Sequence, residues 1–146
     1  MAYENLFHAQ VADGILLISS DASGPNADGR SLLDCKTGVL LSGDTGARRL
    51  LYATSDFVPL DVFADSLRRL KAYPFDVMYS AHDRCALPKT HIDLMLQVIE
   101  QDTQTTEPNL LDIPGICRLA LWQRGEMDQI AYFDFSMPDT VWESLQ

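Results

Sequence analysis

Short apolar runs of strand length, separated by polar segments, are the main feature of the first half of the chain. Strands are predicted at residues 14–18, 31–33, 39–42 and 75–79. Residues 19–29 are rich in Ser, Gly, Asp and Pro, so they are expected to form a loop. Residues 34–38 are turn-like, and the runs on either side of them are therefore predicted to form a hairpin. The apolar patch at residues 50–52 is too short for its type to be assigned.

Two longer segments carry the spacing of amphipathic helices. The first spans residues 59–73, and Pro74 is expected to end it because the residue before a proline is pushed out of the α region. The second spans residues 88–101, with Pro88 in its first turn. Its apolar face is expected to hold Ile92, Met95, Leu96 and Ile99.

The remaining segments complete the predicted order of elements. Residues 102–114 are polar and contain proline, so a connection is expected there. Apolar runs at residues 117–123 and 129–135 flank a polar turn and are predicted to form a hairpin. The order strands, helix, strand, helix, hairpin predicts an α/β fold with one mixed sheet and helices on one face, in a single domain over residues 1–146. The apolar side chains on the other face of such a sheet must also be shielded from water.

Charge and composition exclude several classes of function. The net charge of −10, without a basic run, disfavours binding to nucleic acid or to an anionic membrane surface. The chain has no run of 18 apolar residues and no secretory signal, so no membrane span and a cytoplasmic location are expected. Cys35, Cys85 and Cys117 are odd in number and lack CxxC spacing, which predicts reduced thiols.

Two of the predicted strands end near a side chain that binds metals. The run at 39–42 leads into Gly43 and Asp44, and the run at 75–79 leads into His82. Ligand sites of open α/β sheets lie beyond the carboxyl ends of strands, so Asp44 and His82 are candidates to share one ion. A carboxylate with an imidazole suits zinc or iron. The alternative is that Asp44 caps a turn and His82 is an ordinary loop histidine.

Three motifs occur in a fixed order along the chain. A hairpin ends in Gly43-Asp44-Thr45, a helical segment carries Ser66-Leu67-Arg68-Arg69-Leu70, and a strand ends in Ser80-Ala81-His82. This order and spacing resemble the C-terminal half of a metallo-β-lactamase-fold hydrolase. The resemblance implies half of an αββα sandwich. It also implies that Asp44 bridges two metal ions and that His82 binds the second of them.

The chain departs from the family pattern at the other metal ligands. Asn26 stands where the family has a histidine that binds the first ion, and a neutral amide is a poor zinc ligand. The family signature His-x-His-x-Asp-His does not occur in the sequence. Asp44 and His82 alone give two ligands, whereas a catalytic zinc site has three from protein. Asp83 and His91 are expected to be solvated surface residues rather than replacements.

These features leave three hypotheses about function. The first is an incomplete hydrolase of an ester, thioester or phosphoester, dependent on zinc, iron or manganese and completed by a partner that supplies the N-terminal half. The second is a non-catalytic binding or structural module derived from that fold, without a metal. The third is an unrelated α/β binding domain. The exposed sheet face predicts a homodimer, or a partner, covering side chains such as Leu33, Leu41 and Val77.

Overall fold

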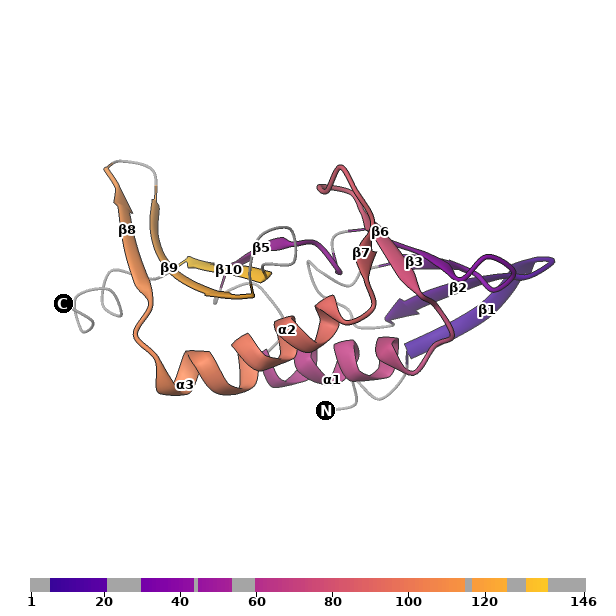
Figure 1. Cartoon of the computed structure of the whole chain (residues 1–146), viewed down its shortest axis with the longest axis horizontal. Helices are drawn as coiled ribbons and strands as arrows, with labels where there is room; N and C mark the ends of the chain where they lie inside the picture. The colour runs from indigo at the N-terminus through magenta and orange to yellow at the C-terminus, as the bar shows by residue number, and fades with distance from the viewer. Residues whose placement is uncertain are drawn as a thin grey trace.

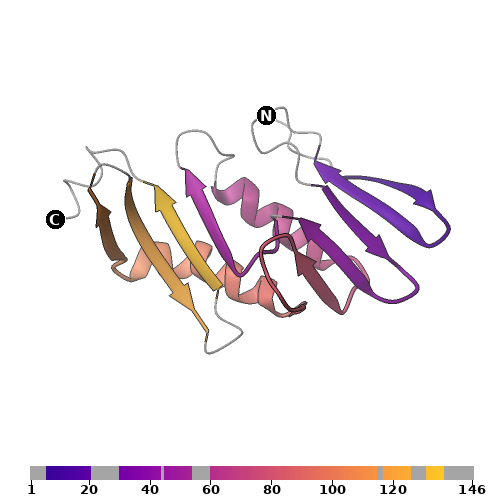
Figure 2. The same cartoon turned by 90° about the horizontal axis from the view of Figure 1, so that it is seen from above.

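The computed structural model of the chain describes residues 6–20, 30–43, 45–53, 60–114, 117–125 and 131–136. Within these residues the strands form two sheets, and the helices lie on one side of both (Figures 1 and 2). The mixed α/β class is therefore confirmed, although the strands divide between two sheets rather than forming one. In the described part of the chain no helix is long and apolar enough to cross a membrane.

The first sheet contains six strands. They are β1 (Leu6–Ala12), β2 (Ile15–Ser20), β3 (Arg30–Asp34), β4 (Val39–Gly43), β6 (Val77–Ser80) and β7 (Leu87–Pro88). Their order across the sheet is β1-β2-β3-β4-β6-β7. The predicted hairpin of β3 and β4 is confirmed. Strands β4 and β6 are parallel neighbours, because the chain crosses over between them through a strand and a helix.

The second sheet contains four strands. They are β5 (Arg49–Ala53), β8 (Asn109–Ile113), β9 (Cys117–Arg124) and β10 (Ala131–Ser136), in the order β5-β10-β9-β8. The predicted C-terminal hairpin is confirmed as the antiparallel pair β9 and β10. The connection expected over residues 102–114 is wrong in part, because β8 pairs with β9 there. The unassigned patch at residues 50–52 lies in β5, which is parallel to β10.

The first predicted helix is confirmed with slightly shorter bounds, as α1 (Leu60–Lys71). Asp61 lies in its first turn and Lys71 in its last, which suits the dipole of the helix. Its buried face carries Ala64, Leu67 and Leu70, at the three-residue spacing of one face of a helix.

The second predicted helix begins and ends later than expected. It runs as α2 (His91–Gln97), a π-helical stretch η1 (Val98–Asp102) and a last turn α3 (Thr103–Thr105). Pro88 lies outside it and pairs with Val77 at the edge of the first sheet, where a residue without an N–H is tolerated. The helix extends past residue 101, and in its last turn the Thr103 hydroxyl donates a hydrogen bond to the Ile99 carbonyl at 2.7 Å.

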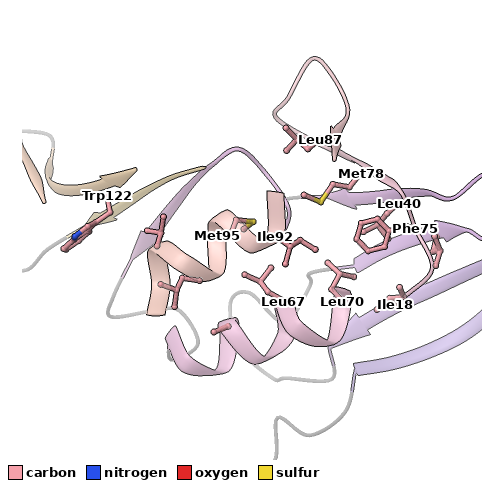
Figure 3. Packing of buried hydrophobic residues seen from close by; sticks show 14 of the residues in the cluster. Ile18, Leu40, Leu67, Leu70, Phe75, Met78, Leu87, Ile92, Met95 and Trp122 are labelled. Atoms are coloured by element: carbon pink, nitrogen blue, oxygen red, sulfur yellow. The ribbon is translucent and has the colours of Figure 1, made fainter. Parts of the chain in front are cut away.

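The hydrophobic core lies between the first sheet and the two long helical segments (Figure 3). Each layer contributes fully buried side chains, namely Leu33, Leu40 and Met78 from the sheet, Leu67 from α1, and Ile92 and Met95 from α2. Trp122 of β9 belongs to the same cluster, so the second sheet shares this core. The core therefore occupies one face of the first sheet and leaves the other face outside it.

Candidate functional site

The carboxyl ends of β4 and β6 lie at the same edge of the first sheet. Gly43 and Ser80 are partners in the register of these two parallel strands. The expectation that the two apolar runs end side by side is thus confirmed at the level of the strands. Asp44 and Asn26 lie outside the described residues, so their roles as metal-site positions stay predictions. His82 is exposed in the loop after β6, and its role as a ligand also stays a prediction.

The loop after β6 is organised by Ser80 and Asp83. The Ser80 hydroxyl donates to Asp83 Oδ2 at 2.6 Å and accepts the backbone N–H groups of His82 at 3.2 Å and Asp83 at 3.1 Å. Asp83 Oδ2 also accepts the backbone N–H of Arg48 at 2.8 Å. Asp83 is therefore half-buried and joins two loops, rather than being the solvated residue expected. Its hydrogen bonds fix the loop that presents His82.

His91 is also not the solvated residue that the sequence suggested. It is 1% exposed at the start of α2, because the first turn of that helix faces the core. Neither ring nitrogen makes a well-formed hydrogen bond within the described residues. Burial lowers the pKa of His91 below its usual value of 6.5; the backbone of Ala47 and the charge of Asp83 oppose this shift, and the charge of Arg48 adds to it. A buried imidazole in this setting is neutral at pH 7.

A complete metal site is not present within the described part of the chain, where no three His, Cys, Asp or Glu side chains lie close enough together to hold an ion. One carboxylate and one thiol near the strand ends have other contacts. Asp83 is engaged as described above, and Cys85 receives a long contact from Arg48 Nη2 at 3.5 Å. A metal with three protein ligands at this edge would therefore need at least one group from outside the described residues.

The sheet face opposite the helices is the second candidate site, and Figure 2 views the molecule from this side. Leu32 pairs with Leu41, and these side chains are 39% and 50% exposed. Leu33 pairs with Leu40, and both are fully buried on the helix side. The expectation that Leu33 lies on the open face is wrong, because adjacent strand positions point to opposite faces and Leu32 takes that place.

An apolar row crosses this open face from strand to strand. Register partners along it are Leu17 on β2, Leu32 on β3, Leu41 on β4 and Tyr79 on β6. We call these four residues the leucine–tyrosine row. Tyr79 is 44% exposed, and Leu17 is half-buried. A row of large apolar side chains on neighbouring strands forms a continuous surface, since strands lie about 4.8 Å apart.

A less exposed line of side chains runs beside this row. Its register partners are Ile15, Asp34, Val39 and Val77. Asp34 is the charged member. The Thr37 hydroxyl and the backbone N–H of Lys36 donate to its carboxylate at 2.8 and 2.9 Å, which lowers the pKa of Asp34. Val77 is half-buried on this face, as predicted from the sequence.

Comparisons with known proteins do not assign the chain to a family. No protein-family model matches the sequence. A search of the curated proteins finds no match either.

Proposed function

We propose that this protein is a binding module whose working surface is the sheet face opposite the helices. The observation that supports the proposal is the leucine–tyrosine row, in which Leu32, Leu41 and Tyr79 are each about 40–50% exposed on neighbouring strands. Burial of apolar surface contributes about 25 cal/mol per Å², and contiguous exposed apolar patches on proteins mark interaction sites.

The chemistry of the face defines the kind of partner. The face is broad and apolar and is formed by side chains of neighbouring strands. Such a surface suits packing against another sheet, whereas a small molecule binds in a concave pocket. This agrees with the resemblance to half of an αββα sandwich, in which a second sheet covers this face. The partner is accordingly a protein that presents an apolar sheet surface.

The first experiment compares two equally exposed leucines. Leu41→Glu places a charge in the leucine–tyrosine row, and Leu111→Glu places one on β8 of the other sheet, where Leu111 is 47% exposed. The readout is the fluorescence of the apolar dye 8-anilinonaphthalene-1-sulfonate with submicromolar protein. We expect Leu41→Glu to reduce dye binding several-fold and Leu111→Glu to leave it near the wild-type level. Equal dye binding by all three proteins would contradict the proposal.

A second candidate function is the metal-dependent one. The parallel pairing of Gly43 with Ser80 favours it, because Asp44 and His82 follow these residues in sequence at the edge where ligand sites gather. Asp44 and His82 would hold one ion in the chain itself, and a partner half would supply the further ligands that a catalytic site needs. When bound, the metal would supply an activated water for hydrolysis of an ester, thioester or phosphoester.

Metal analysis tests this candidate directly. The full chain is purified without chelator, and zinc, iron and manganese are measured by elemental analysis. The candidate expects about one zinc per chain, lost in His82→Ala and Asp44→Asn and kept in the control His8→Ala on β1. Folded protein that carries no metal, and takes up none when titrated with zinc, would rule out this candidate for the chain alone and leave the binding module.

A further inference from the structure

We infer that the partner on this face is a second copy of the chain, packed face to face about a two-fold axis that runs along the leucine–tyrosine row. The inference rests on the proposed function and adds the identity and orientation of the partner. It is carried by the order of side chains along β3. Arg30, Leu32 and Asp34 alternate with buried residues, so a cation, an apolar group and an anion stand in line on the open face.

A face-to-face dimer has its two-fold axis in the plane between the sheets. The charges of Arg30 and Asp34 determine the direction of that axis. An axis across the strands, above Leu32, turns the second β3 antiparallel to the first. Arg30 then lies over the partner's Asp34, and Asp34 lies over the partner's Arg30. An axis along the strands would place Arg30 over the partner's Arg30, which like charges disfavour.

The same axis also aligns the apolar residues. The leucine–tyrosine row crosses the strands, so an axis across the strands follows the row itself. Leu32, Leu41 and Tyr79 each meet their own counterpart in the second copy. Two sheets that pack with nearly aligned strands interdigitate such side chains over about 10 Å. The same two-fold axis therefore pairs Arg30 with Asp34 of opposite copies and buries the leucine–tyrosine row.

Charge balance makes this face the suitable one for self-association. The chain carries a net charge of −10, so two copies repel over most of their surfaces. On the open face of the first sheet, the charged strand positions whose side chains the structure describes are Arg30 and Asp34, and their charges cancel. The carboxylate of Asp34 is held in place by its bonds from Lys36 and Thr37 and keeps lone pairs for a guanidinium.

The first test is the oligomeric state of the full chain, measured by sedimentation velocity across the micromolar range. We expect a dimer for the wild type and for Leu111→Glu, and a dimer weakened roughly tenfold or more for Leu41→Glu. A wild type that stays monomeric while its dye binding still depends on Leu41 overturns the second-copy inference and leaves the binding module with another partner. Dye binding that does not depend on Leu41 overturns the proposed function itself.

The second test uses mixed variants to determine the axis. Arg30→Asp alone and Asp34→Arg alone each set like charges against each other, so each is expected to weaken its own dimer. A mixture of the two restores opposite charges at both contacts and is expected to form a heterodimer. Failure of the folded mixture to associate overturns the antiparallel arrangement.

A second pair of variants leaves the turn at Asp34 intact, in case Asp34→Arg unfolds the hairpin. Leu32→Lys and Leu32→Asp each place like charges on the axis, because Leu32 meets the partner's Leu32. Neither variant alone should dimerise, whereas the mixture should. If these variants dimerise alone as strongly as the wild type, the axis does not pass above Leu32 and the inference fails. Circular dichroism of each variant verifies the fold.

Discussion

Leu32 and Leu33 are consecutive residues of β3 with opposite surroundings. Leu33 is fully buried against the helices, and Leu32 is 39% exposed on the open face. We expect Leu33→Ala to lower the free energy of unfolding by about 2–5 kcal/mol, since it removes buried methyl groups and leaves a cavity. Leu32→Ala should cost less than about 1 kcal/mol. Urea denaturation at submicromolar concentration gives both values, and equal losses would contradict the assignment of faces.

His91 links stability to pH. Burial lowers the pKa of His91 in the folded protein, whereas in the unfolded chain His91 titrates near its usual pKa of 6.5. As pH falls below about 6.5, His91 binds a proton in the unfolded state more readily than in the folded state. The contribution of His91 to the free energy of unfolding is therefore fully present above this pH and declines below it. The slope from one group is at most about 1.4 kcal/mol per pH unit. His91→Gln should therefore decline less steeply between pH 7 and pH 5 than the wild type in urea denaturation, and equal slopes would count against the buried imidazole.

The hairpin of β3 and β4 is an element whose turn has specific requirements. The Gly38 N–H donates to the Asp34 carbonyl at 2.9 Å, and Gly38 has a φ of +71°. A side chain in this left-handed conformation costs about 1–2 kcal/mol, and a Cβ on Gly38 would also meet Asp76 Oδ2 at 2.6 Å. Gly38→Ala should lower the unfolding free energy by about that amount. Cys35→Ala in the same turn is the control, because Cys35 is exposed and should change little.

At the scale of the whole molecule, an ion pair joins the helical layer to the second sheet. Arg124 at the end of β9 donates through Nε and Nη2 to the two carboxylate oxygens of Asp102, at 2.8 and 2.6 Å. Asp102 lies at the end of η1 and is almost fully buried. The Asp102 carboxylate raises the pKa of Arg124, so the guanidinium stays charged at all working pH values.

Asp102→Asn should lower the melting temperature by a few degrees, because it removes the charge from a two-point contact. Hydrogen exchange should accelerate more in β9 than in β3, since β9 carries Arg124 while β3 lies in the other sheet. Gln97→Ala is the control, as its oxygen receives only a long contact from Arg124 at 3.4 Å. Uniform acceleration of exchange in both sheets would show that the contact supports the entire fold rather than the second sheet.

Several features of this protein follow from the sequence alone. The helix over residues 60–71 is predictable because its two signals, the apolar spacing and the proline that follows, depend only on neighbouring residues. The hairpins β3–β4 and β9–β10 are predictable because turn residues separate the two apolar runs of each hairpin. The common edge reached by β4 and β6 also follows from the sequence, because two apolar runs joined through a helix tend to be parallel neighbours.

Only the tertiary structure decides the features that depend on distant partners. Strand β8 pairs with β9, although the wider segment at residues 102–114 is mostly polar and contains proline. The position of Asp83 depends on Arg48, which lies 35 residues away. The Leu-Leu pairs at residues 32–33 and 40–41 look alike from both faces, so their pattern does not reveal which leucine is buried. Hairpin register and helix packing settle that choice and leave Leu32 and Leu41 on the open face.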